Sequence, residues 1–181
     1  MAKRKAVKPS AAGTKRFELI HPAAGGIEFV NRFAGFEFYK NMVAHNGAGV
    51  AVGDVNGDDL ADIYLCNIQG GNALYLNQGN FRFRPVTQTA GVADEDKMST
   101  GSALADVDND GDKDLLVNGI QSGTRLFLND GSGGFQLSEI SGLDSAGTTS
   151  SLALADIDGD GDLDLYVAHY IDRMHLADPT T

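Results

Sequence analysis

The sequence predicts an all-β protein made of a repeated unit of four short strands, and three observations lead to this fold class. An aspartate-rich window of nine residues occurs three times, starting at Asp54, Asp106 and Asp156, which are 52 and 50 residues apart. Short apolar segments flank each window at matching distances. Turn-forming residues separate these segments, which are too short for helices. Self-similarity at such a period is typical of repeat architectures.

The first two strands of each repeat are expected on either side of its aspartate window. The apolar segments before the windows are 49–53, 101–105 and 151–155, and those after them are 63–66, 115–117 and 165–167. These segments are apolar on both faces, as expected of strands packed between neighbouring sheets. Each window is therefore predicted to be the loop of a β-hairpin.

A third and a fourth strand are expected in the first two repeats. Segments 74–79 and 126–131 both read Leu-Tyr/Phe-Leu-Asn-x-Gly, in which Asn-x-Gly is turn chemistry, and segments 81–87 and 135–140 follow. Four-stranded units with a period near fifty residues are typical of β-propeller blades. Since a ring needs at least about four blades, we expect a partial, open propeller of about three.

The repeats divide the chain into five predicted segments. These are a disordered basic tail at 1–16, N-terminal strands at 17–45, blade repeat 1 at 46–97, blade repeat 2 at 98–147, and a partial blade repeat 3 at 148–181. The N-terminal strands are expected at 17–20 and 27–30, where apolar residues alternate or cluster. The third repeat is predicted to stop after its second strand.

The charge of the chain restricts its partners. From residue 17 onward the chain contains 8 basic residues and all 25 of its acidic residues, which gives this part a net charge of −17. Such a body repels nucleic acid and anionic lipid and suits cations, so no nucleic-acid partner is expected. No apolar stretch approaches the ~20 residues of a membrane span. Cys66, the single cysteine, lies in an apolar run and is expected to be a buried thiol.

The aspartate windows have the spacing of a calcium site. The windows hold 14 of the 20 aspartates, which excludes a chance distribution. A calcium ion takes six to eight oxygen ligands. Side chains at positions 1, 3, 5 and 9 and the carbonyl at position 7 supply them. The expected ligands are Asp54, Asn56, Asp58, Leu60 and Asp62 in loop one (54–62), Asp106, Asp108, Asp110, Asp112 and Asp114 in loop two (106–114), and Asp156, Asp158, Asp160, Asp162 and Asp164 in loop three (156–164). About three Ca²⁺ ions per chain are therefore expected.

Two further positions, counted from the first aspartate of each window, refine this prediction: position 6 lies inside the window, and position 12 lies in the strand after it. Gly111 and Gly161 occupy position 6, where a sharp turn needs no side chain, and loop one has Asp59 there, which tolerates left-handed backbone. An EF-hand needs Glu at position 12 and flanking helices, whereas that position is apolar in all three windows. Magnesium fits less well because it demands a small octahedral shell.

The motifs quoted above resemble a known family. Asp-x-Asp/Asn-x-Asp-x-x-x-Asp followed by an apolar strand resembles the FG-GAP/VCBS-type repeat of integrin-α-like propellers, over about residues 46–170. Leu-Tyr/Phe-Leu-Asn-x-Gly and the pair Gly134-Phe135 are similar to the VCBS-type variant. Segment 26–30, Gly-Ile-Glu-Phe-Val, resembles a segment that precedes such blades in the cartilage acidic protein (ASPIC/UnbV) group.

The resemblance implies a seven-bladed propeller when complete, with calcium in the loop between the first two strands of a blade. It also implies secretion or surface display, although no signal peptide is recognisable in this chain. Members of the family are mostly adhesion or binding modules. A non-catalytic module that binds calcium and an extracellular protein or glycan is therefore the first functional hypothesis.

A fragment of a calcium-dependent propeller enzyme that acts on polysaccharide, as a lyase or hydrolase, is the alternative. Such an enzyme needs a base beside a sugar-binding metal. Few basic residues occur after residue 16, and no Gly-x-Ser-x-Gly elbow is present. No catalytic residue is therefore expected.

Overall fold

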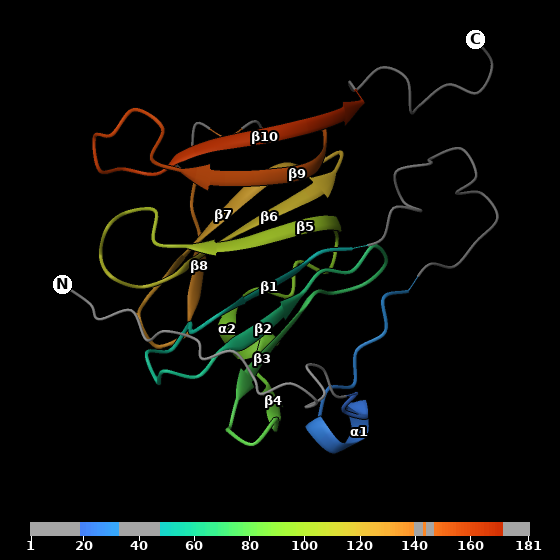
Figure 1. The fold of residues 1–181 in the computed structure, drawn as a ribbon. Helices are drawn as coiled ribbons and strands as arrows, with labels where there is room; N and C mark the ends of the chain where they lie inside the picture. The colour runs from blue at the N-terminus through green and yellow to red at the C-terminus, as the bar shows by residue number, and fades with distance from the viewer. Residues whose placement is uncertain (1–18, 33–47, 140–142, 144–146, 172–181) are drawn as a thin grey trace, which may run out of the picture.

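The computed structural model describes residues 19–32, 48–139, 143 and 147–171, and in these residues the protein is almost entirely β (Figure 1). Two four-residue helical turns accompany the strands. The elements are α1 Pro22–Gly25, β1 Val50–Gly53, β2 Asp62–Leu65, β3 Ala73–Asn77, β4 Phe83–Pro85, α2 Thr87–Ala90, β5 Met98–Ala105, β6 Asp114–Ile120, β7 Gly123–Asn129, β8 Phe135–Leu137, β9 Thr148–Ala155 and β10 Asp164–Ile171.

The strands form antiparallel sheets in which each strand pairs with the next along the chain. The orders are β1-β2-β3-β4, β5-β6-β7-β8 and β9-β10. The three hairpins share one register, because the position-9 aspartate always pairs with the last residue of the preceding strand, as in Gly53↔Asp62 and Ala105↔Asp114. The predicted all-β class with four-stranded, propeller-type blades is therefore confirmed.

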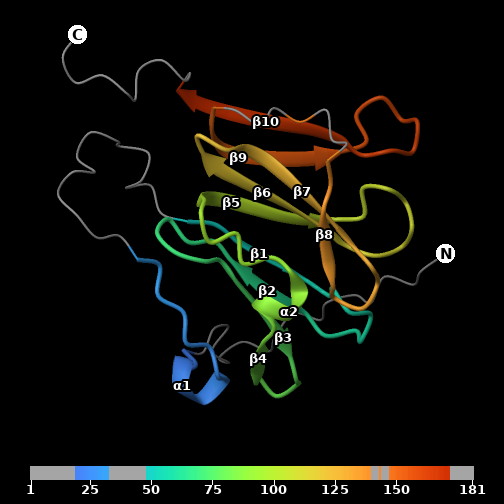
Figure 2. The same cartoon turned by 180° about the vertical axis from the view of Figure 1, so that it is seen from behind.

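The three sheets follow one another through their first strands. β5 contacts β1 on one side and β9 on the other. Figure 1 shows the sheets fanned in chain order, and Figure 2 shows the same succession from behind. The described residues therefore form consecutive partial blades of a propeller, with the three aspartate loops at the same edge.

The hydrophobic core lies between the first two sheets. Its buried members are Ala51, Val55, Tyr64, Cys66, Leu74, Leu76, Val86, Ala90, Val92, Leu115, Val117 and Phe127. Five of them, Ala51, Tyr64, Cys66, Leu115 and Val117, come from the segments that the sequence predicted to be apolar on both faces, and the others come from β3, β7, loop one and the region of α2. Cys66 is among them and is a free thiol, so its predicted burial is confirmed.

The third sheet joins the second mainly through threonines. The Gly119 N–H donates to the Thr149 hydroxyl at 3.0 Å, and that hydroxyl donates to the Gly123 carbonyl at 3.0 Å. The Thr100 hydroxyl donates to the Thr149 carbonyl at 2.6 Å. Threonine hydroxyls, that of the buried Thr149 among them, therefore bond these two sheets, whereas the hydrophobic core described above lies between the first two sheets.

The prediction of strands within 17–45 is wrong for its described part, residues 19–32. Pro22 opens the helical turn α1, and Gly26 ends it with a left-handed φ of 77°. Residues 27–30 are not in a strand. Side chains hold the segment on the first sheet instead: Arg32 N–H donates to Asn67 Oδ1 at 3.1 Å, and Ile68 N–H donates to Asn31 Oδ1 at 3.1 Å.

Other predicted segments fall outside the described residues. The basic tail at 1–16 lies there, as do residues 33–45 and the end of repeat 3 from 172 to 181. In the part of the chain that the structure describes, no helix has the length and apolar character to cross a membrane.

Candidate metal centres

All three aspartate windows are hairpin loops, as predicted. They connect β1 to β2, β5 to β6 and β9 to β10, and they lie along one edge of the molecule, on the left in Figure 1. Loops two and three also touch each other, because Asn109 Nδ2 donates to Asp162 Oδ1 at 2.9 Å. The sequence thus places three acidic loops side by side.

Side-chain oxygens at positions 3 and 5 fold each loop by accepting the N–H two residues ahead; they belong to carboxylates except at Asn56, which accepts through its amide oxygen. Asp110 N–H donates to Asp108 Oδ1 at 3.3 Å, and Asp112 N–H donates to Asp110 Oδ1 at 3.0 Å. Loop three repeats these bonds at 3.2 and 3.0 Å, and loop one at 3.3 and 2.9 Å. Such Asx turns explain why aspartate and asparagine alternate with other residues. In loops two and three these bonds use one oxygen of each carboxylate and leave the other to offer, whereas in loop one Asp58 Oδ2 also accepts from Asn56 Nδ2 at 3.1 Å.

The position-1 aspartates differ among the loops. Asp54 accepts four backbone N–H groups, the shortest from Asp59 at 2.7 Å and Gly57 at 2.8 Å. Slight burial raises the pKa of Asp54, but these N–H groups lower it more, so the net shift is downward. Asp106 accepts a bond at Oδ2 from Gly111 N–H at 3.1 Å, and its Oδ1 has no partner in the described residues. Asp106 therefore retains more capacity for a ligand.

The position-9 aspartates close their loops with the same bond. Val55 N–H donates to Asp62 Oδ2, Val107 N–H to Asp114 Oδ2, and Ile157 N–H to Asp164 Oδ2, each at 2.9 Å. Burial raises the pKa of Asp62 despite the N–H groups that lower it. Each of these carboxylates has a structural role besides the predicted ligand role.

Left-handed backbone occurs where the loop turns. Position 6 has φ of 65° at Asp59, 101° at Gly111 and 99° at Gly161, as the sequence led us to expect. Position 4 is also left-handed, at Gly57, Asn109 and Gly159. These residue types adopt positive φ at low cost, so they let nine residues close into a compact loop.

Two loops bring three carboxylates together. In loop two, oxygens of Asp106, Asp108 and Asp114 lie within 4.8 Å of one another. In loop three, the same holds for Asp156, Asp158 and Asp160. Desolvation, reinforced by the neighbouring carboxylates, raises the pKa of Asp108. A bound cation would relieve the repulsion between these neighbouring carboxylates.

The donor set of loop two fits calcium. Its side-chain donors are hard carboxylate oxygens, which calcium prefers. Asp106 Oδ1 is buried and has no hydrogen-bond partner in the described part of the chain. A buried polar atom of this kind is costly unless something pairs with it. An oxygen-seeking cation held by Asp106, Asp108 and Asp114 would supply that partner.

Not every expected ligand joins these groups. Within the described residues, loop one forms no comparable group of three acids, and Asn56 takes the place of its third carboxylate. The Asp110 and Asp164 carboxylates lie outside the groups of their loops. Leu60, Asp112 and Asp162, expected to contribute their carbonyls, are held in the loops through their N–H groups.

Sequence reasoning missed the role of two asparagines that end the third strands. Asn77 Nδ2 donates to the Ala61 carbonyl at 2.9 Å, and its N–H donates to Asp62 Oδ1 at 2.8 Å. Asn129 N–H donates in the same way to Asp114 Oδ1 at 2.9 Å. The Leu-aromatic-Leu-Asn-x-Gly segment predicts a third strand, and its Asn was assigned only to the turn that follows. Its repetition at a fixed distance after two of the aspartate windows was the signal that could have revealed this role.

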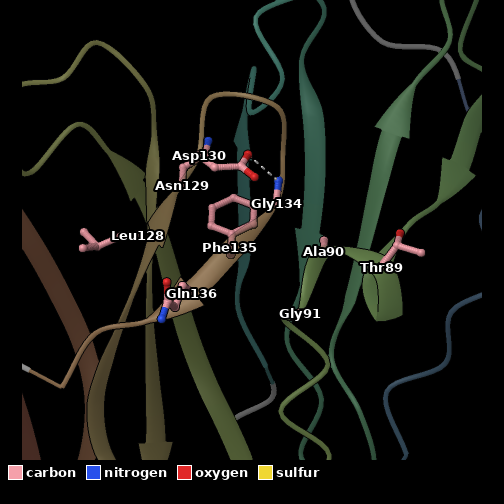
Figure 3. Close-up of a pocket in the computed structure, with 9 residues that line it drawn as sticks. All are labelled: Thr89, Ala90, Gly91, Leu128, Asn129, Asp130, Gly134, Phe135 and Gln136. Carbon is pink, nitrogen blue, oxygen red and sulfur yellow. Dashed lines mark hydrogen bonds between the residues drawn. The ribbon is translucent and has the colours of Figure 1, made fainter.

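A pocket of about 380 Å³ lies between α2 and the β7–β8 turn, and Figure 3 shows the residues that line it. The Asp130 carboxylate beside it accepts N–H groups of Ser132 at 2.9 Å and Gly134 at 3.1 Å. The Ser132 hydroxyl, which also donates to Asp130, lowers the pKa of Asp130 most, and the two N–H bonds lower it further. Asp130 thus stabilises the turn, and the pocket is a crevice between blades.

The buried basic residue Arg125 is also engaged within the fold. It is ion-paired with Asp94 across the junction of the first two sheets. Burial lowers the pKa of Arg125 and raises that of Asp94, although each partner opposes the shift of the other. This pair links two blades.

The repeats match a known protein family. Residues 54–117 and 106–167 each match the FG-GAP-like repeat, and together they span more than half of the chain. The chain belongs to this family. Each matched stretch starts at one aspartate loop and ends in the strand after the next one, which is the spacing found in the structure.

The chain is also similar to known proteins. An 82-residue stretch is 38% identical to cartilage acidic protein 1 of Mus musculus, and 35% identical to the proteins of that name from Xenopus tropicalis and Homo sapiens. The matches cover 45% of this chain but only 13%, 13% and 12% of the respective relatives. The predicted relation to the cartilage acidic protein group is confirmed, and none of these names denotes an enzyme.

Proposed function

We propose that this chain is a calcium-binding, non-catalytic FG-GAP repeat module that displays a binding surface outside the cell. The observation that carries the proposal is the orphaned, buried Oδ1 of Asp106 within a group of three carboxylates. Two further loops have the same register and the same closing bond. Three equivalent acidic hairpins at one edge support a shared role in holding cations.

Calcium rather than magnesium suits these loops. Their ligands come from Asx turns of varied geometry, and calcium accepts irregular coordination by six to eight oxygens, whereas magnesium needs a near-ideal octahedron. Loops two and three offer four carboxylates each at the expected side-chain positions 1, 3, 5 and 9, and loop one offers three because Asn56 stands at position 3. Affinity rises with the number of charged ligands, so loop one is expected to bind most weakly.

An extracellular location agrees with the chemistry of such loops. Their acidic side chains are largely exposed, and extracellular calcium modules work with dissociation constants of about 10⁻⁴–10⁻³ M. The similarity to cartilage acidic protein 1 supports the same location. A protein or glycan is the proposed ligand, and its proposed site is the face opposite the loops, which carries the β2–β3 and β6–β7 connections.

Calorimetric titration of the whole chain with calcium tests the proposal. We expect about three ions per chain, with one site weaker than the other two. Asp108→Ala should remove one ion and lower the thermal midpoint in calcium, with a much smaller effect in chelator, because ligand binding adds to stability by mass action. Fewer than two ions per chain, or equal shifts in both conditions, would contradict it.

No contact among the described residues favours the polysaccharide-cleaving alternative. The catalytic hypothesis is nevertheless simple to test by incubating the chain with acidic polysaccharides in calcium and recording the ultraviolet absorbance of unsaturated products. We expect no product. Product formation that chelator abolishes would replace the binding module with an enzyme.

A further inference from the structure

Asn129, the last residue of β7, contacts two aspartate loops that belong to different blades. Its Nδ2 donates to the Lys113 carbonyl in loop two at 3.0 Å and to the Val55 carbonyl in loop one at 2.9 Å. Its N–H donates to Asp114 Oδ1 at 2.9 Å. The side chain is buried at the start of the β7–β8 turn (Figure 3). One amide group therefore bridges neighbouring candidate metal loops.

Val55 is the point at which this bridge reaches loop one. It lies between Asp54 and Asn56, two of the expected ligands. Its N–H is held by Asp62 Oδ2 and its carbonyl by Asn129, so both of its backbone polar groups are fixed. A shift of Asn129 would therefore displace the backbone that carries two ligands of loop one.

Asn129 is equally tied to loop two. Asp114 is a member of the carboxylate group of that loop, and both of its oxygens accept bonds, one from Val107 N–H and one from Asn129 N–H. Any change that fixes the Asp114 carboxylate also fixes the backbone of Asn129. The amide then holds the Val55 carbonyl in its bonded position.

We propose that Asn129 is a positioning residue that couples calcium binding in loop two to the calcium affinity of loop one, an inference that rests on the calcium function proposed above. The coupling works through pre-organisation: an ordered loop two lowers the cost of ordering loop one. Because coupling between two equilibria is reciprocal, filling loop one must strengthen loop two by the same factor.

Asn77 provides a matched control within the same chain. It ends β3 as Asn129 ends β7, and its N–H donates to the closing carboxylate of its own loop, Asp62. Its Nδ2 reaches the Ala61 carbonyl, as that of Asn129 reaches Lys113, and its Oδ1 accepts from Gly79 N–H at 2.9 Å. Asn129 differs by its additional bond to a neighbouring blade.

The experiment is a calcium titration of the ¹⁵N-labelled chain, in which the amide signals of Gly57 and Gly111 report loops one and two separately. Asp108→Ala, which disables loop two, should weaken calcium binding at Gly57 by about fivefold or more. When Asp108→Ala is added to a chain that already carries Asn129→Ala, it should change the calcium affinity reported by the Gly57 signal by less than about twofold. When Asp108→Ala is added to a chain that carries Asn77→Ala, it should still weaken the calcium binding reported by Gly57 by about fivefold or more.

Three outcomes would overturn the inference or its basis. An unchanged Gly57 affinity in the Asp108→Ala chain would refute the coupling, and this arm does not depend on folding of an Asn129 variant. Full coupling in Asn129→Ala would refute the role of Asn129. If neither glycine signal responds to calcium in the unsubstituted chain, the proposed calcium function fails, and the coupling fails with it.

Discussion

Repeats one and three have the same first hairpin but bury it to very different extents. Tyr64 in β2 is 0% exposed, whereas Tyr166 at the equivalent position of β10 is 71% exposed. Val55 in loop one is 2% exposed, and its counterpart Ile157 in loop three is 75% exposed. The difference arises from the neighbouring sheet: the second sheet covers the first, whereas the described residues include no further sheet beyond the third.

The two hairpins share their closing bond and their register despite this difference. The closing bond is 2.9 Å in both loops, and the strands on either side pair in the same register. Loop geometry is therefore encoded within each repeat, by aspartates that accept N–H groups of their own loop. Burial comes from the neighbouring repeat, which contributes Asn129 at the Val55 carbonyl.

The largest expected effect is the difference in unfolding free energy between substitutions of the two tyrosines. Tyr64→Ala should lower the free energy of unfolding by about 3–5 kcal/mol, because it empties a packed site between two sheets. It also removes the hydroxyl that donates to the Val92 carbonyl at 3.0 Å and accepts from Asn72 Nδ2 at 2.7 Å. Tyr166→Ala should change the same quantity by about 0.5 kcal/mol or less.

Urea denaturation of both variants in chelator, with the slope against denaturant compared to the unsubstituted chain, measures these losses. If Tyr166→Ala were as costly as Tyr64→Ala, the third sheet would be covered in solution, and the comparison between the repeats would not hold.

A second, smaller effect compares the closing carboxylates. Asp62 is buried and accepts N–H groups of Val55 at 2.9 Å and Asn77 at 2.8 Å, whereas the exposed Asp164 accepts that of Ile157. Asp62→Ala in chelator should cost about 3 kcal/mol, because it leaves two donors unpaired, and Asp164→Ala about 1 kcal/mol.

Thermal unfolding in chelator gives both values without a contribution from metal. A larger loss in Asp164→Ala than in Asp62→Ala would show that burial does not set the importance of this carboxylate.

The aspartate loops could be predicted from sequence because their chemistry is local. Every bond that shapes loop two from within, such as Asp110 N–H to Asp108 Oδ1, joins residues a few positions apart. The left-handed turn at Asp59 is equally a consequence of residue type and position. The four-strand repeat was visible for the same reason, since strand lengths and turn residues recur within about fifty positions.

Features that depend on distant contacts could not be predicted. Asn129 is 74 residues from Val55, and a turn-forming Asn-x-Gly already explained its presence. Residues 27–30 have the alternation of a strand, but they lie on the first sheet through Asn31 and Asn67 side chains rather than a strand ladder. A sequence pattern shows what a segment can form, and the partner it meets decides the outcome.

The smallest expected effect concerns Cys66, the single thiol in the core of the first two sheets. Burial raises its pKa to about 11 from an ordinary value of 9.0. The native state therefore retains the thiol proton at a pH where the unfolded state has lost it. This contribution to stability is fully present below about pH 9 and is lost as pH rises through about 11.

The loss should amount to about 2 kcal/mol between these limits. Cys66→Ala lacks the thiol, so its free energy of unfolding should fall less over the same pH range, although it starts lower because of the cavity. Burial also raises the pKa of Tyr64, but both chains retain that tyrosine, so its contribution cancels in the difference. Parallel pH dependence in the two chains would show that Cys66 meets solvent, and that the junction between the first two sheets is as open as the uncovered side of the third.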